Sequence, residues 1–208
     1  MKSISFIAYA LLFSLLVIFT GCVDDDVPPE ENEEETITDV TLTFAPTGGA
    51  GTPVTATWKD ADGEGVGDPV LTPITLAANT TYTLTIDLIN AIDPNDPESI
   101  TEEVEEEAKE HMFFFGWTDG LFSNPTGDGN LGAGKRTDPV NYADDDDDPN
   151  DPNDEVFPLG LETTWITGDA TTGDFQIVLK HQPDIKSATS DSTDGVSDVD
   201  ITWEVTVR

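Results

Sequence analysis

Residues 199–207 read VDITWEVTV, and this stretch decides the fold. Apolar side chains occupy every second position from Val199 to Val207, and aspartate, threonine and glutamate stand between them. Such alternation is typical of a β-strand with one face buried and one in water, because successive strand side chains point to opposite faces. Trp203 stands at the centre of the pattern, so we expect it in the core and Thr202 on the solvent face.

The same alternation recurs along the chain. Further sets with a period of two lie at 40–44, 54–58, 82–88 and 175–181. Shorter apolar runs lie at 70–76, 112–117 and 161–166, and glycine, proline and aspartate separate them. About eight short strands divided by turn residues predict a mainly β fold, an antiparallel β-sandwich. Because the chain has one cysteine, burial or bound ions rather than disulfides must stabilise it.

One segment has helical periodicity instead. Residues 99–111 read SITEEVEEEAKEH, and Ile100, Val104, Ala108 and His111 share one helical face. Ser99 has capping-box spacing to a following glutamate, with the threonine at 101 as the alternative N-cap. The segment predicts one short α-helix at about 100–111. Glutamates four residues apart repel each other near its C-terminal end, and a cation there would relieve the repulsion.

The N-terminus has the features of a targeting signal. Lys2 precedes an apolar run at 6–20, which is shorter than the roughly twenty residues of a membrane span. The run ends IFTGC, with small residues before Cys22, which predicts a lipoprotein signal peptide at 1–21 and a lipidated Cys22. An ordinary secretory signal followed by a free cysteine is the alternative. Residues 22–36 are acidic and predict a disordered tether, which leaves 37–208 as a single domain.

The chain is strongly acidic, with 43 acidic and 8 basic residues and a formal net charge of −35. This charge attracts cations and repels nucleic acid, so we expect no nucleic-acid partner. Solubility in a salty habitat is another explanation for it. Residues 144–154 read DDDDDPNDPND and predict a flexible acidic insertion in the domain, with weak calcium binding as the alternative.

The two histidines of the chain are candidate metal ligands. His111 stands at the end of the predicted helix, Glu107 lies one turn before it, and His181 continues the inward-facing set at 175–179. If the two strands meet, Glu107, His111 and His181 form a transition-metal site, with Glu110 as a spare ligand. The alternative is two unrelated histidines at strand ends, each bonded to a backbone carbonyl.

A second candidate is a calcium site in the glycine-rich stretch at 60–68. Its ligands would be Asp60, Asp62, Glu64 and Asp68, because alternating acids around a glycine resemble the start of a calcium loop. Position twelve of an EF-hand would fall on Leu71, which excludes that motif. A glycine-rich hairpin with solvated acids is the alternative.

Catalytic signatures are missing from the sequence. It contains no G-x-S-x-G elbow, no H-E-x-x-H zinc motif, no P-loop and no dinucleotide fingerprint. Acids are so frequent that paired carboxylates carry no information about glycosidase chemistry. We therefore expect a protein that is not an enzyme and whose one candidate cofactor is a divalent metal ion.

Five segments resemble a family of small Bacteroidetes lipoproteins usually labelled "type 1 periplasmic binding fold superfamily protein". They are ITDVTLTF (37–44), WKDADGEGVGDP (58–69), TLAANTTYTLTIDL (75–88), ITEEVEEEAKEHMFFF (100–115) and VLKHQPD (178–184). The two-lobed α/β fold of that label differs from the alternation seen here, which predicts strands. The resemblance implies a companion of TonB-dependent receptors in the outer membrane, and hence nutrient or metal capture.

The resemblance also bears on location. Asp24, Asp25 and Asp26 resemble the surface-export signal of Bacteroidetes lipoproteins, which implies a surface-exposed protein; a protein facing the periplasm is the alternative. We expect a binding protein that captures a metal or metal complex for a TonB-dependent receptor. The rival hypothesis is a structural or adhesive surface module whose acidic loops bind calcium or only maintain solubility.

Overall fold

The computed structural model describes residues 35–48, 51–63 and 67–208. The predicted signal peptide, Cys22, most of the tether and Glu64 of the candidate calcium site lie outside these residues. No helix in the described ranges has both the length and the apolar character needed to cross a membrane.

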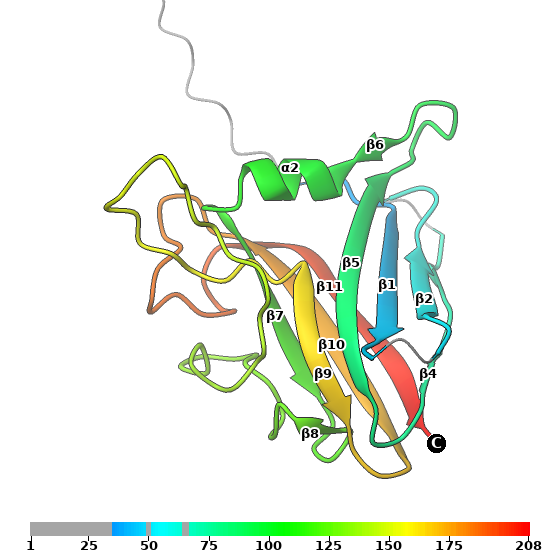
Figure 1. Cartoon of the computed structure of the whole chain (residues 1–208). Helices are drawn as coiled ribbons and strands as arrows, with labels where there is room; N and C mark the ends of the chain where they lie inside the picture. Colours follow the sequence, from blue (N-terminus) through cyan, green and yellow to red (C-terminus); the bar gives the residue numbers. More distant parts are fainter. Residues whose placement is uncertain (1–34, 49–50, 64–66) are drawn as a thin grey trace, which may run out of the picture. The chain divides into compact units, whose positions relative to one another are not determined.

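The described part of the chain is mainly β and contains eleven strands and one short helix (Figure 1). The strands are, in chain order, β1 (Asp39–Pro46), β2 (Val54–Lys59), β3 (Val70–Leu71), β4 (Ile74–Leu76), β5 (Thr81–Asn90), β6 (Glu98–Ser99), β7 (His111–Trp117), β8 (Phe122–Asn124), β9 (Glu162–Thr167), β10 (Thr171–His181) and β11 (Val196–Val207). The helix is α2 (Ile100–Glu106). The predicted fold class, a mainly β sandwich with one short helix, is confirmed.

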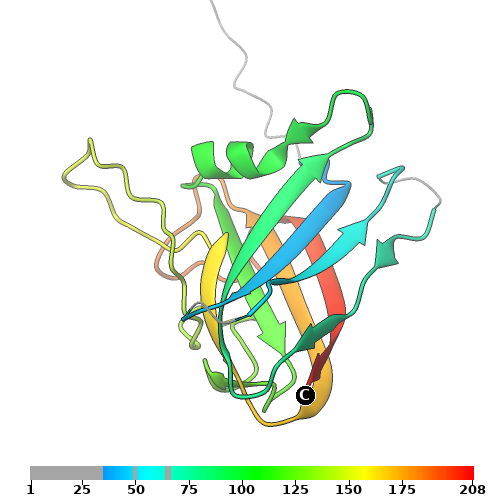
Figure 2. The same ribbon diagram turned by 45° about the vertical axis from the view of Figure 1, so that its right-hand side comes forward.

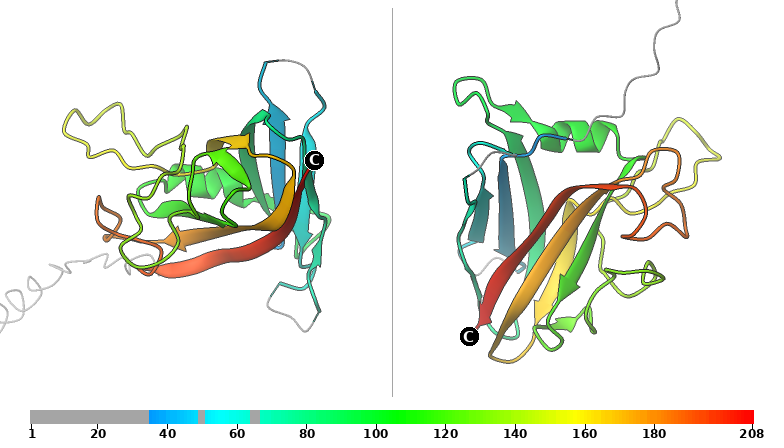
Figure 3. Two further views of the ribbon diagram at one scale, coloured as in Figure 1. Left: turned by 90° about the horizontal axis from the view of Figure 1, so that it is seen from below. Right: turned by 180° about the vertical axis from the view of Figure 1, so that it is seen from behind.

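The strands form two sheets. The larger sheet has the order β3-β2-β1-β5-β9-β8, with β6 paired to β5, and the smaller sheet has the order β4-β11-β10-β7. β10 and β11 run behind β1 and β5 in Figure 1, and the views in Figures 2 and 3 show the same two layers from other sides. Aromatic side chains pack between the layers; the rings of Phe44 and Phe175, one from each sheet, lie 6.1 Å apart.

Burial along β11 follows the predicted alternation. The five apolar side chains of its alternating set are buried, and Trp203 is only 1 % exposed, whereas Thr202 is exposed. The strand pairs with β10 on one side and β4 on the other. β7 differs, because all seven of its residues are buried. β7 is the last strand of its sheet, and loop residues bond to its free edge, where the side chain of Asn130 accepts a hydrogen bond of 2.9 Å from the backbone N–H of Phe115.

One pairing departs from the expected antiparallel arrangement, because β4 lies parallel to β11. The apolar run at 70–76, which we expected as one strand, is divided between β3 in the larger sheet and β4 in the smaller sheet. Pro73 separates the two strands and has no N–H for a sheet ladder, so the run cannot continue as one strand.

The helix begins as predicted and ends early. The Ser99 hydroxyl accepts a hydrogen bond of 3.3 Å from the backbone N–H of Glu102, as an N-cap does. α2 ends at Glu106, so the predicted extension to residue 111 is wrong, and His111 is the first residue of β7. Glutamates four residues apart repel each other here, and the last turn contains no basic residue to offset them.

The acidic insertion at 144–154 is tied to the domain at three positions, one of them the ion pair between Asp154 and Lys109. The Asp144 carboxylate accepts hydrogen bonds from the backbone N–H groups of Gly160 (2.8 Å) and Glu162 (3.0 Å). Asp146 is buried, and one of its carboxylate oxygens lies 2.9 Å from the Lys186 ammonium. The expectation of an insertion that is flexible throughout is therefore wrong for these three aspartates. Residues 149–153 are exposed, as expected of a solvated acidic loop.

Candidate metal centre

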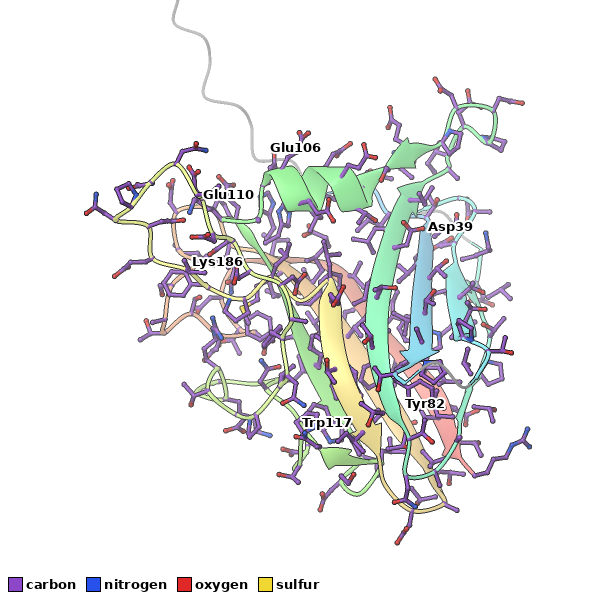
Figure 4. The ribbon with its side chains drawn as sticks, in the orientation of Figure 1. Asp39, Tyr82, Glu106, Glu110, Trp117 and Lys186 are labelled. Carbon is purple, nitrogen blue, oxygen red and sulfur yellow. The ribbon has the colours of Figure 1, made fainter. Side chains whose placement is uncertain are left out.

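The two histidines lie opposite each other on neighbouring strands. β7 and β10 pair antiparallel, with His111 in register with His181, and their rings stack with centroids 4.4 Å apart and planes 9° apart. Their side chains share the inner face of the smaller sheet with the core residues Phe113 and Leu179. Figure 4 shows Glu110 and Lys186 at this end of β7, with Trp117 at the opposite end. Alternation along two strands thus brings both imidazoles to one end of the core.

Glu107 is the third member of this group. It caps the C-terminal end of α2, and one ligand atom from each of Glu107, His111 and His181 lies within 4.8 Å of the other two. The backbone carbonyl of Glu107 also lies 3.2 Å from Nδ1 of His111. A proton on Nδ1 would donate to that carbonyl and leave Nε2 with a lone pair, which is how many metal-binding histidines are held.

The remaining ring nitrogens are buried polar atoms without a good partner. Nε2 of His111 and Nε2 of His181 have no hydrogen-bond partner among the residues that the structure describes. Nε2 of His181 lies 3.4 Å from a carboxylate oxygen of Glu110, but the two atoms do not form a hydrogen bond. A buried nitrogen without a partner costs about 1–3 kcal/mol, and a metal ion would remove this cost.

Burial and nearby charged groups keep the His111 ring neutral. Burial, followed by the neighbouring His181, lowers the pKa of His111 to about 4, although its hydrogen bond to the Glu107 carbonyl acts in the opposite direction. Lys186 is nearby and also lowers this pKa. A neutral imidazole is the form that binds metal, so His111 is available as a ligand at neutral pH.

Carboxylates surround the imidazoles on one side. Burial raises the pKa of Glu35 to about 7, and a hydrogen bond with Glu103 and the negative charges of Glu103, Glu107 and Asp198 add to this rise. One oxygen of Asp198 lies 3.8 Å from Nε2 of His111, and neither side chain of this pair is exposed. A divalent cation would neutralise part of this negative charge.

The sequence predicted Glu107, His111, His181 and the adjacent Glu110, and the structure brings all four to one place. It did not predict Asp198 or Glu35. Asp198 immediately precedes the alternating set of β11, and continuing the alternation backwards predicts a solvent-facing side chain. Glu35 belongs to a stretch expected to be a disordered tether. Neither residue gives a signal in the sequence that could have identified it.

The candidate calcium ligands at 60–68 are described only in part. Desolvation and a hydrogen bond with Asp62 raise the pKa of Asp60. A carboxylate oxygen of Asp62 accepts a hydrogen bond of 3.1 Å from the backbone N–H of Gly67, while Asp68 is exposed. Glu64 lies outside the described residues, so the four-residue calcium site stays a prediction. Within the described ranges, the group of three or more convergent ligand side chains is Glu107, His111 and His181.

The chain was compared with known proteins in three ways. A scan against protein-family models gave no matching family, and searches of curated proteins and of solved structures gave no match either. The functional assignment therefore depends on the chemistry of the residues themselves. That chemistry is a pair of buried, stacked imidazoles next to several carboxylates at one end of a β-sandwich.

Proposed function

We propose that this protein is a lipid-anchored binding protein of the outer membrane that captures a divalent transition-metal ion and is not an enzyme. Glu107, His111 and His181 hold the ion. The observation that carries the proposal is the convergence of these three side chains within 4.8 Å, with the Nε2 atoms of both histidines lacking hydrogen-bond partners in the described part of the chain. Ligand atoms about 2.1 Å from one ion lie within about 4 Å of each other, so small side-chain adjustments suffice.

The pair of imidazoles is suited to a metal rather than to proton transfer. Two rings stacked 4.4 Å apart repel each other when both are charged, and His111 has its pKa lowered to about 4. A general base works best with a pKa near the working pH, so this value disfavours acid–base catalysis. Two imidazoles and a carboxylate suit zinc, iron or copper better than calcium.

The position of Glu107 is consistent with capture and release. Its side chain is exposed, whereas both histidines are buried, so one ligand of the site faces solvent. The expected lipid on Cys22 would hold the protein at the outer membrane, and the resemblance to lipoproteins associated with TonB-dependent receptors supports delivery of the ion to such a receptor. Export to the cell surface follows from the acidic residues after Cys22; a periplasm-facing protein would deliver to the same membrane.

A second candidate function is a structural or adhesive surface module. The hydrogen-bonded carboxyl groups of Asp60 and Asp62 favour it, because Asp62 raises the pKa of Asp60 and a calcium ion between the two acids would relieve their repulsion. In that case the net charge of −35 would serve mainly to keep the protein soluble or to bind calcium. The two functions predict different ions, so they can be distinguished directly.

The test is a titration of the metal-free mature chain carrying Cys22→Ser with zinc, cobalt and calcium. We expect zinc and cobalt to bind and to raise the melting temperature with the logarithm of free metal, because the ion binds the folded state. His111→Ala and His181→Ala each abolish the rise, and the double variant is no worse than either. A rise caused by calcium alone, unchanged in both histidine variants, would favour the structural module.

A further inference from the structure

An irregularity in β11 sets the direction of one side chain. Along the β10–β11 ladder, Leu179 pairs with Val199, but the next residue, Lys180, pairs with Ser197. Asp198 is therefore the extra residue of a β-bulge. In a regular strand it would share the solvent face with Asp200 and Thr202. Bulges redirect side chains and often occur beside functional sites, and here the Asp198 side chain has no exposed surface.

The bulge directs Asp198 toward the candidate metal centre. Its Oδ2 lies 3.8 Å from Nε2 of His111, a nitrogen that is fully buried and has no hydrogen-bond partner within the described ranges. When Nδ1 of His111 donates to the Glu107 carbonyl, Nε2 presents a lone pair to this oxygen. Two acceptors that face each other repel, whereas both are attracted to a cation between them. A separation of 3.8 Å is within the roughly 4 Å expected for two ligands of one ion. Asp198 is not one of the three side chains that converge within 4.8 Å, so ligation by it requires its carboxylate to move toward Glu107 and His181 when the ion binds.

Asp198 also borders a cavity of about 330 Å³, although its carboxylate oxygens are themselves buried. The other charged groups of its wall are Glu35 and Asp60, and Trp58 forms part of the apolar wall. No lysine or arginine occurs among the lining residues of the described chain. A cavity lined by carboxylates attracts cations and repels anions, so an aquated metal ion is favoured there over a negatively charged metal chelate.

We propose that Asp198 is the fourth ligand of the metal centre, and that the site takes the aquated divalent ion from this cavity rather than an anionic chelate. The inference rests on the proposed metal-binding function and defines its ligand class. Two imidazoles and two carboxylates give a set of two nitrogens and two oxygens, and the two negative charges balance a divalent ion. Such a mixed set is suited to zinc, iron(II) and cobalt(II).

Cobalt(II) tests the fourth ligand, because its visible absorption reports the atoms that coordinate it. We expect Asp198→Asn to weaken cobalt binding by at least about tenfold and to alter the absorption band. Asp200→Asn is the matched control: it removes the next acid of the same strand, which is exposed and accepts a hydrogen bond from Gln176, and we expect wild-type binding. Glu35→Gln removes a nearby negative charge but no proposed ligand. It should therefore weaken cobalt binding modestly and leave the absorption band of bound cobalt unchanged.

The outcomes distinguish the inference from the proposed function. Wild-type affinity and absorption in Asp198→Asn, together with loss of binding in His111→Ala, would overturn the role of Asp198 and leave the metal site standing. No cobalt binding by the wild-type chain would overturn both. Melting curves of the metal-free variants show whether each is folded. Asparagine keeps the shape of aspartate, and unfolding of Asp198→Asn that cobalt fails to reverse would also contradict its role as a replaceable ligand.

A separate experiment tests whether the site takes the free metal ion or an anionic chelate. The chain is mixed with preformed cobalt–citrate, separated from small molecules, and analysed for cobalt and for citrate. We expect cobalt to remain with the protein and citrate to be removed. Citrate retained in a fixed ratio to cobalt would show that the site accepts an anionic chelate, and would overturn this part of the proposal.

Discussion

At His111, burial and a neighbouring imidazole both favour the neutral ring, and the pKa falls to about 4. An unfolded histidine titrates near 6.5. Between these values the unfolded chain binds more protons than the folded one, so the free energy of unfolding falls as the pH falls. The full effect is about 3 kcal/mol, and above about pH 6.5 it makes no further difference.

This pH dependence is measurable in the metal-free protein. We expect the free energy of unfolding, measured in urea, to decrease between about pH 6.5 and pH 4 more steeply in the wild type than in His111→Gln. Glu35 opposes the trend, because its raised pKa favours the folded state at lower pH, but it acts equally in both proteins. Identical slopes for the two proteins would mean that His111 is not held neutral by the fold.

Residue by residue, the sequence could predict the part of the site that depends on regular spacing. His181 continues an alternating strand, which indicates its place in the core. Glu107 and His111 were expected together because they are four residues apart on a helix, but the helix ends at Glu106 and a turn at 107–110 connects them. Asp198 could not be predicted, because a bulge reverses the face that alternation assigns to it. A bulge depends on how two strands pair, and the pattern of a single strand does not contain that information.

At the scale of the strand, substitutions in β11 test whether one face of the strand is buried in the sandwich. Trp203 is 1 % exposed and lies among aromatic and aliphatic core residues, so Trp203→Asp places an unpaired charge in the core. This costs several kcal/mol, comparable to the roughly 5–15 kcal/mol that stabilise a whole domain, and we expect an unfolded protein. Thr202→Asp on the exposed face is the control and should fold. Circular dichroism spectra and melting curves distinguish them; equal tolerance of both would contradict the observed burial.

A second prediction at this scale concerns the contribution of the acidic insertion at 144–154 to stability. Lys186 has a side chain that is 1 % exposed and is paired with Asp146, so removal of Asp146 leaves a buried charge without its partner. We expect deletion of 144–154 to destabilise the domain by about 3–5 kcal/mol. Deletion of the exposed residues 149–153 alone should change the melting temperature little. Equal stability of the two deletions would show that the contacts of Asp144 and Asp146 contribute nothing.

Long strands were predictable and short ones were not. β1, β5, β10 and β11 each span eight residues or more, which is enough for alternation to be visible in the sequence. β3 and β6 have two residues each and β4 has three, too few for any period to show. The early end of α2 has another cause, because apolar spacing continues to His111 while like charges at its C-terminal end oppose the helix.

For the whole molecule, the expected lipid on Cys22 determines where the metal centre works. We expect Cys22→Ser to abolish labelling with palmitate and to release the protein from the membrane fraction or leave it as an uncleaved precursor. The physical reason is that two or more acyl chains are needed for stable anchoring, and the serine variant has none. Unchanged palmitate labelling of the variant would remove the proposed anchor and leave the metal centre untouched.

The whole account depends on an ion held by both histidines, and X-ray absorption at the zinc edge of the zinc-loaded mature chain tests this most directly. We expect a shell of nitrogen and oxygen ligands at about 2.0–2.1 Å together with the outer-shell scattering typical of two imidazole rings. His181→Ala should lose half of the imidazole signal if it retains zinc at all. An all-oxygen shell without imidazole scattering, or no bound zinc, would contradict a metal centre built on His111 and His181.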